Sequence, residues 1–303
     1  MRLRIAVRAG AALVAVLAFC FAAGYPASAQ SQAQGNAPAA AVPARSAGSP
    51  PRYFNFVHER LKPGRESAYD RTLAAIRNSY QEFDIPAYWL ELRSLTGPDE
   101  MAALNFFESF GEMEETVRGM GEGIAAHPGL MPRQDALLEE NVSSVTNLIA
   151  ERVDALSSRA STINLAKMRL LHVTVFHVLP GHENEFAEAA TDIARAYEKV
   201  DGSPAWVMYA VNAGAPAPAY IMMTALASLK DEDAAAARRA PAMEAAGAAV
   251  QQRLREIASS AYASIETNIY FVSPLLSNMP EEFTNLDPDY WTPKPNPPVK
   301  NSH

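Results

Sequence analysis

The sequence predicts an α+β protein made of two tandem repeats, each with the element order βαββαβ. The stretch at residues 57–66, an apolar strand followed by a Pro-Gly turn and a charged helix start, returns at residues 174–183, an offset of 117. Trp89 and Trp206, two of the three tryptophans in the chain, are separated by the same offset. A register that is kept over this length indicates a tandem duplication.

Each Pro-Gly turn is followed by apolar residues at the spacing of an amphipathic helix. These stripes predict helices over residues 65–83 and 183–200. The matching positions are Tyr69, Leu73, Ile76, Tyr80 and Phe83 in the first repeat, and Phe186, Ala190, Ile193, Tyr197 and Val200 in the second.

The remaining elements follow in the same order in both repeats. Strands are expected at residues 53–61, 87–95, 103–109 and 145–153, and then at 170–179, 205–212, 220–227 and 265–273. A second helical segment in the first repeat covers residues 112–126 and resumes near Arg133, after His127-Pro128-Gly129. Its counterpart is an alanine-rich helix over residues 230–261, which we expect to be interrupted near Pro241.

The first 29 residues have the pattern of a secretory signal peptide. Arg2, Arg4 and Arg8 precede an apolar stretch at residues 9–23, and Ala27-Ser28-Ala29 fits a cleavage site. We therefore expect a periplasmic or secreted protein with no stable membrane insertion after cleavage. The alternative is an uncleaved membrane anchor.

The rest of the chain divides by composition. Residues 30–51 contain almost no large apolar group and predict a flexible leader. We expect the repeats at residues 52–153 and 169–273, joined by a linker at 154–168 that forms a short helix. The tail at residues 274–303 is rich in proline, which excludes regular structure. Either Tyr290 and Trp291 hold this tail on the body of the protein, or it is disordered.

Charge and cysteine content restrict the possible partners. Cys20, the single cysteine, lies in the signal segment, so the mature chain has no disulfide. Without residues 1–29 the chain has 23 basic and 34 acidic side chains, a net charge of −11. This balance argues against nucleic acid and anionic membranes. Because an internally duplicated barrel needs no partner to close, we expect a monomer with an internal pseudo-dimer.

The predicted βαββαβ unit is ferredoxin-like, and its duplication resembles the dimeric α/β-barrel superfamily in its fused form. The resemblance covers residues 53–273 and rests on the element order, the two Pro-Gly corners and the paired tryptophan strands. It implies two antiparallel sheets packed face to face around a central pocket. The superfamily includes haem-degrading and antibiotic-synthesis monooxygenases and chlorite dismutases, so the resemblance implies a fold and no single reaction.

Strand alternation predicts which side chains line the pocket between the sheets. We assign Phe54, Phe56 and His58 to the helix-covered face, and the intervening residues to the pocket. The predicted ligand-binding set is then Asn55, Glu59, Trp89, Glu91 and Arg93 from the first repeat, and His172, Thr174, Trp206 and Met208 from the second. A shift of one residue in register would exchange the two faces.

Two histidines are candidates for chemistry. His172 is a candidate general base, since imidazole titrates near neutral pH, and its alternative role is structural. The resemblance implies that His127 lies where haem-binding members place an axial ligand, while the following Pro-Gly favours a helix end. The sequence contains no HExxH or HxH spacing, phosphate-binding loop, nucleophile elbow or dinucleotide fingerprint.

These observations leave three functional hypotheses. The first is binding, or transformation, of a small apolar molecule in the pocket between the sheets. The second is a non-catalytic structural or protein-interaction protein whose barrel is filled by its own side chains. The third, less favoured, is a haem-binding monooxygenase-like protein.

Overall fold

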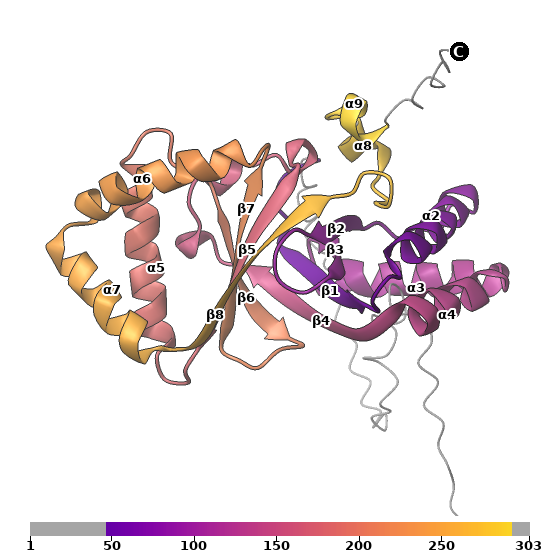
Figure 1. Cartoon of the computed structure of the whole chain (residues 1–303), viewed down its shortest axis with the longest axis horizontal. Coiled ribbons are helices and arrows are strands. Elements are labelled where there is room, and N and C mark those ends of the chain that lie inside the picture. The colour runs from indigo at the N-terminus through magenta and orange to yellow at the C-terminus, as the bar shows by residue number, and fades with distance from the viewer. Residues whose placement is uncertain (1–46, 293–303) are drawn as a thin grey trace, which may run out of the picture.

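The computed structural model describes residues 47–292, and both repeats adopt the predicted order of strands and helices (Figure 1). The first repeat contains β1 (Tyr53–Leu61), α2 (Glu66–Glu82), β2 (Leu90–Ser94), β3 (Glu100–Phe107), α3 (Phe110–Ala126), α4 (Leu130–Asn141) and β4 (Val142–Arg152). The second contains β5 (Leu170–Val178), α5 (Glu183–Glu198), β6 (Val207–Ala213), β7 (Ala219–Leu226), α6 (Lys230–Ala246), α7 (Ala248–Ser260) and β8 (Tyr262–Val272). The predicted signal peptide and most of the leader lie outside the described residues.

The eight strands form one closed barrel in the order β1-β3-β2-β8-β5-β7-β6-β4. Within each repeat the strands have the ferredoxin-like arrangement, and the two sheets join through β2 with β8 and β4 with β6. This confirms the predicted pseudo-dimeric α/β barrel. Closure by hydrogen bonds at both seams leaves no unpaired sheet edge.

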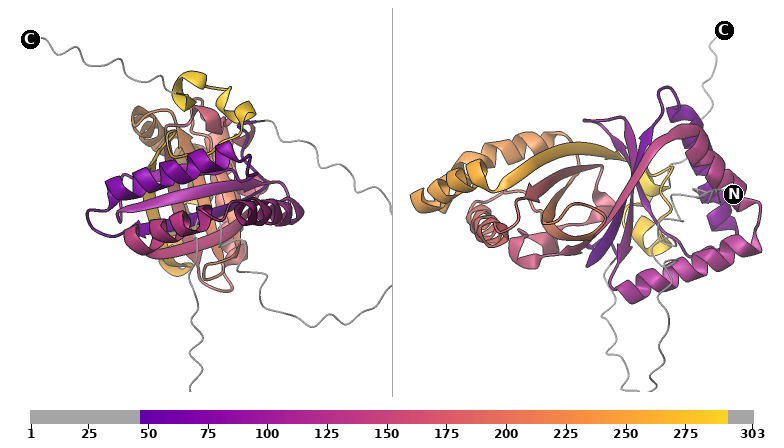
Figure 2. Two further views of the ribbon diagram at one scale, coloured as in Figure 1. Left: turned by 90° about the vertical axis from the view of Figure 1, so that its right-hand side faces the viewer. Right: turned by 90° about the horizontal axis from the view of Figure 1, so that it is seen from below.

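All neighbouring strands are antiparallel, so alternate strands around the barrel run in the same direction. β1 and β5 therefore begin at the same end of the barrel. We call this the linker end, because the segment between the repeats crosses it, and we call the opposite end the hairpin end. The helices of each repeat cover the outer face of their own sheet (Figure 2).

The predicted assignment of strand faces is wrong by one residue in both repeats. The largest buried cluster combines Phe54 and Phe56 with Leu171 and Val173, so these residues fill the barrel interior. Val57 instead packs with the apolar stripe of α2 on the outer side of the sheet. The error arose because both faces of these strands are buried, so hydrophobicity alone does not distinguish them.

The linker and the tail are equivalent parts of the duplication. The linker forms three short 3-10 turns, η1 (Asp154–Leu156), η2 (Ala160–Thr162) and η3 (Leu165–Lys167). Trp206 Nε1 donates to Leu156 O at 3.1 Å, and Trp89 Nε1 donates to Leu276 O at 3.0 Å. Each tryptophan thus holds the segment that follows the last strand of the other repeat.

The described part of the tail is docked against the linker end. It contains two single-turn helices, α8 (Glu281–Thr284) and α9 (Pro288–Trp291), although its prolines had excluded regular structure. Proline is tolerated in the first turn of a helix, which is the position of Pro288. Trp291 is buried and donates to Ala166 O at 2.7 Å, while the Arg169 guanidinium stacks over Tyr290.

The alanine-rich segment of the second repeat is interrupted at a different residue from the one predicted. Pro241 lies within α6, and the break between α6 and α7 is at Gly247, which has a φ of +82°. Such a positive φ favours glycine and ends a helix. Within residues 47–292, none of the helices is both long enough and apolar enough to cross a membrane.

Candidate functional site

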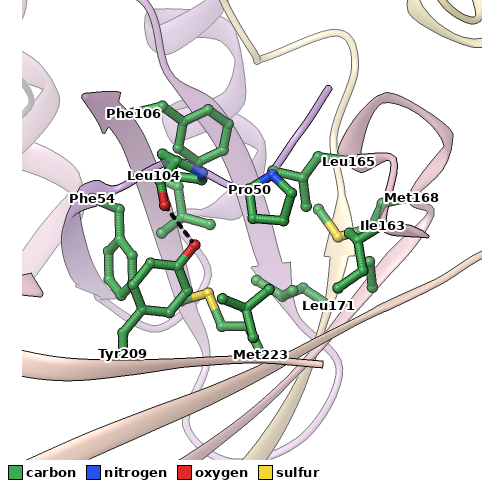
Figure 3. Close-up of a pocket in the computed structure, with 13 residues that line it drawn as sticks. Pro50, Phe54, Leu104, Phe106, Ile163, Leu165, Met168, Leu171, Tyr209 and Met223 are labelled. Carbon is green, nitrogen blue, oxygen red and sulfur yellow. Dashed lines mark hydrogen bonds between the residues drawn. The ribbon is translucent and has the colours of Figure 1, made fainter. Parts of the chain in front are cut away.

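The barrel interior is filled by the protein's own side chains. Between Phe54, Leu104, Tyr209 and Met223 at the linker end, the remaining cavity is about 20 Å³ (Figure 3). This is room for about one water molecule. Tyr209 closes the cavity further, because its hydroxyl donates to Pro51 O at 3.2 Å. In this conformation this cavity therefore has no space for a small organic ligand.

A polar network lies inside the barrel toward the hairpin end. Glu100 Oε1 accepts a hydrogen bond from the Tyr270 hydroxyl at 2.7 Å and lies 3.1 Å from His58 Nδ1. Burial alone would raise the pKa of Glu100, but the hydrogen bonds from His58 and Tyr270 lower it below its usual value. An ionised Glu100 only accepts, so His58 donates to it from Nδ1.

This network exists in only one part of the barrel. His58 and Glu100 come from the first repeat and Tyr270 from the second, and the side chain of His58 is 23% exposed. At the three positions related by the duplication, the chain has Val175, Ala219 and Ala150. The arrangement can orient an imidazole toward the barrel end.

A second polar cluster is buried between the first sheet and α2. The Tyr69 hydroxyl donates to Glu59 Oε2 at 2.6 Å and lies 3.3 Å from Glu91 Oε1. All three side chains are at most 1% exposed. The other carboxyl oxygens, Glu59 Oε1 and Glu91 Oε2, have no hydrogen-bond partner among the described residues.

Burial decides the protonation of this cluster. Removal from water raises the pKa of Glu59 to about 7, even though the hydrogen bond from Tyr69 opposes the shift. Burial, and then the charge of Glu59, raise the pKa of Glu91 well above its usual value. A protonated Glu91 can donate to the phenol oxygen of Tyr69, which gives the cluster a consistent set of hydrogen bonds. The positions related by the duplication are Phe176, Phe186 and Met208, an apolar set.

The second repeat contains an open cleft on the helix-covered side of its sheet. The cleft has a volume of about 410 Å³ and lies between η2 and η3 of the linker, the loop before β6, the end of β7 and the start of α6. Small-molecule sites in proteins have volumes of roughly 300–1,000 Å³. Its walls are mainly apolar, with Thr224 and Ala235 on facing elements and Lys167 on the linker.

His172 lies next to this cleft. It is paired in register with Thr224, and its Nδ1 atom is 2.5 Å from Glu232 Oε1 in the first turn of α6. The side chains of His172 and Glu232 are 19% and 22% exposed. This pair connects the sheet to α6 beside the cleft.

In the first repeat, glycines on α3 allow this helix to lie close to the loop before β2. A Cβ atom added at Gly119 would lie 3.0 Å from the Pro86 side chain, and one at Gly123 would lie 2.9 Å from Ile85. The backbone of α3 therefore contacts the loop before β2 directly. At an offset of 119 from Gly119 the second repeat has Arg238, whose side chain packs over Gly202 of the equivalent loop.

The structure does not bring all the sequence-predicted ligand-binding residues to one place. All nine are on the helix-covered faces, five in the first repeat and four in the second. Asn55 is buried, and its Nδ2 donates to Asn105 Oδ1 at 3.3 Å, while Arg93 forms an ion pair with Asp70 of α2. Thr174 Oγ1 is 3.1 Å from Thr267 Oγ1. Their prediction as a single pocket depended on the wrong face assignment, and ligand binding by any of them stays a prediction.

His127 is at the end of α3 and stacks on Phe83, with ring centroids 3.7 Å apart and an interplanar angle of 4°. Neither the barrel cavity nor the cleft is lined by His127. The surroundings of His127 therefore do not fit a haem ligand. Within residues 47–292, no group of three or more His, Cys, Asp or Glu side chains is placed to hold a metal ion.

Sequence reasoning did not identify the cleft or the network around Glu100. His58 had been placed on the helix-covered face, and Glu100 and Tyr270 had no motif that distinguishes them. Arg238 could have been found from the sequence, because it replaces a glycine of the first repeat once the offset of 119 is applied.

Comparisons with known proteins are limited to architecture. No protein-family model matches the chain, and no curated protein matches its sequence. A solved structure of an anthrone oxidase-like protein is 16% identical, with 73% of this chain and 92% of that chain covered and a TM-score of 0.45. A double variant of chlorite dismutase from Candidatus Nitrospira defluvii is 8% identical, with 76% and 95% covered and a TM-score of 0.45. A proposed monooxygenase from Lactobacillus acidophilus NCFM is 8% identical, with 73% and 93% covered and a TM-score of 0.44.

The fold assignment rests on the strand order and register described above. Nothing about what these three proteins act on is carried over to this chain.

Proposed function

We propose that this protein binds a small, mainly apolar molecule in the cleft of the second repeat. The observation that carries this proposal is the difference in volume between the two sites, about 410 Å³ in the cleft against about 20 Å³ in the barrel. The proposal keeps the ligand class expected from the sequence and moves the site from the barrel to the outer face of the second sheet. Export through a signal peptide at residues 1–29, a periplasmic or secreted location and a monomeric state are parts of the same proposal.

The duplication supports a specialised role for this cleft. Both repeats have the same elements around it, but in the first repeat Gly119 and Gly123 lie close to Pro86 and Ile85 of the loop before β2. Its walls also combine apolar side chains with a few polar groups at the edge, which is the usual composition of a small-molecule site.

The test uses N-phenyl-1-naphthylamine, a neutral probe whose fluorescence rises in an apolar site, with residues 30–303 of the protein. Ala235→Trp places an indole in the cleft from α6. Ala237→Trp is the matched control, because Ala237 is exposed on the opposite side of the same helix. We expect the wild type and Ala237→Trp to bind the probe with the same affinity, and Ala235→Trp to lose about tenfold or more in affinity.

Two results would overturn the proposal. Equal binding by all three proteins would place the probe elsewhere. If the wild type binds no probe, the cleft does not bind apolar molecules. The second hypothesis, a non-catalytic interaction protein with a filled barrel, would then be favoured, and the small barrel cavity agrees with it.

A further inference from the structure

Two of the described residues that line the cleft of the second repeat are charged, and they belong to different walls. Lys167 is part of η3 in the linker, and Asp231 is in the first turn of α6. Most of the other lining residues are apolar, among them Met168 and Ala235. Because both charged side chains are part of the lining, a ligand in the cleft can reach them, and the balance between them decides which head group is favoured.

A donor pair near the cleft does not enter this balance. The Nε atom of Arg238 and the Oγ atom of Ser203 have no hydrogen-bond partner among the described residues, but both atoms are shielded from solvent. Neither residue lines the cleft. The groups that a ligand can contact are therefore those of the linker, the sheet and the start of α6.

The negative charge of Asp231 is largely balanced by the protein itself. Its Oδ2 atom accepts hydrogen bonds from the backbone N–H groups of Ala227 at 2.7 Å and Ser228 at 3.0 Å. It also lies at the N-terminus of a helix, where the helix dipole stabilises negative charge. The next acid of α6, Glu232, has its own partner, because its Oε1 atom is 2.5 Å from His172 Nδ1. The α6 wall therefore attracts a cationic ligand only weakly.

The positive charge of Lys167 has no such balance. Its side chain is exposed, and in the part of the chain that the structure describes no acidic side chain forms a salt bridge with it. Asn164, which also lines the cleft, accepts from the backbone N–H of Ala166 through Oδ1 at 3.1 Å, and its Nδ2 group remains as a donor. The linker wall thus offers a cation and an N–H donor, and both favour a negatively charged acceptor.

From these contacts we infer that the ligand is an amphiphilic anion, a molecule with an apolar body and one negatively charged head group. The head group lies at the linker wall, where it pairs with Lys167 and accepts a hydrogen bond from Asn164, and the body lies along Met168 and Ala235. An ammonium group is a point charge without the planar fork of a guanidinium, so a carboxylate, a sulfate or a phosphate fits equally well. This inference rests on the proposed function of the cleft and adds the charge of the ligand's head group.

The test compares octanoate, 1-octanol and octylamine as competitors of N-phenyl-1-naphthylamine. The three compounds have apolar chains of similar length, and their head groups are negative, neutral and positive at neutral pH. Because Lys167 is exposed, we expect octanoate to bind the wild type about three- to tenfold more tightly than octanol, and octylamine to bind more weakly than octanol. The preference for octanoate should decrease as salt rises from about 0.01 M to about 1 M, since ions screen exposed charges over this range.

Substitutions of Lys167 assign the preference to this side chain. Lys167→Gln should remove the preference for octanoate over octanol, Lys167→Arg should keep it, and Lys167→Glu should make octylamine bind more tightly than octanoate. Lys199→Gln is the matched control and should keep the full preference, because Lys199 is an exposed cation of the same repeat that does not line the cleft.

The outcomes separate this inference from the proposal on which it rests. If octanoate and octanol bind equally, or octylamine binds most tightly, or none of the three displaces a bound probe, the anionic head group is refuted. The cleft remains a binding site in these cases as long as Ala235→Trp still excludes the probe. Equal losses of preference in Lys167→Gln and Lys199→Gln would show a general effect of charge and would also refute the inference. If the wild type binds no probe, the proposed function fails as well.

Discussion

The buried cluster of Glu59, Tyr69 and Glu91 predicts that the protein loses stability as pH rises through neutrality. The perturbation that isolates this effect is Glu59→Gln, which keeps the size of the side chain and cannot ionise. The Tyr69 hydroxyl can still donate to the amide oxygen at residue 59 in place of Glu59 Oε2. The variant therefore keeps the packing under α2 and removes the titration.

The direction in which stability changes with pH follows from the raised pKa of Glu59. Its pKa is about 7 in the folded protein against 4.5 in the unfolded chain, so the folded state binds more protons between these values. Stability is then highest below pH 4.5 and falls as pH rises through 7. Two and a half units correspond to a loss of about 3 kcal/mol for Glu59 above pH 8.

The charged groups around the cluster change the size of this pH effect on stability but not its direction. The raised pKa of Glu91 adds a loss of the same sign. Asp70 of α2 also raises the pKa of Glu91, whereas Arg93 of β2 opposes the shift. The figure of about 3 kcal/mol is therefore an order of magnitude for the removal of one carboxyl group.

The assay is urea unfolding of the wild type and Glu59→Gln at pH values from 5 to 8.5. We expect the two proteins to be similar at pH 5, and the variant to be more stable by roughly 3 kcal/mol at pH 8.5. Glu266→Gln, at an exposed position of β8, is the matched control and should follow the wild type at every pH. A constant difference between wild type and Glu59→Gln across this range would refute the reasoning.

Three further predictions concern the frame of the fold. Trp206→Phe keeps an aromatic ring but leaves the buried Leu156 carbonyl without its donor, and it should lower the free energy of unfolding by about 1–3 kcal/mol in a urea titration. Tyr270→Phe removes one donor to Glu100, so the pKa of that carboxyl should rise, as followed by NMR titration. Gly214→Ala should lower the melting temperature of the protein far more than Gly181→Ala does. Both glycines have positive φ values, but only at Gly214 would an added Cβ atom clash with the backbone, 2.1 Å from Asn147 O. Equal melting temperatures of the two alanine variants would contradict the last of these.

The sequence predicted the architecture because the duplication supplied the same information twice. A single Pro-Gly turn is weak evidence for a strand-helix corner, but two with matched helices behind them exclude most alternatives. The face assignment failed because β1 and β5 are covered on both sides. In such strands the alternation of polar and apolar residues does not distinguish the barrel interior from the helix-covered face. The break at Gly247 was missed for a related reason, since a glycine in an alanine-rich run is a weaker sequence signal than Pro241.

The candidate site could be predicted only in part. His172 was chosen from the sequence, and the structure places it beside the cleft. The cleft itself depends on how α6 lies relative to the loop before β6, where Arg238 packs over Gly202. Such a contact between distant segments has no local sequence pattern, so it becomes visible only in three dimensions or by comparing the two repeats.

The two repeats act as internal controls for each other, and they separate what the barrel needs from what this protein has added. The residues that differ most sharply in polarity are the buried acids under α2, the network around Glu100 and the donor pair Arg238 and Ser203. In each case the other repeat fills the same positions with apolar or small side chains, which shows that the fold tolerates them. Burying unpaired polar groups is unfavourable, so their presence in only one copy argues for selection by something other than folding. Ser203 lies in the chain between two residues that line the cleft of the second repeat, and the volume of this cleft, about 410 Å³, makes it the strongest candidate for the function.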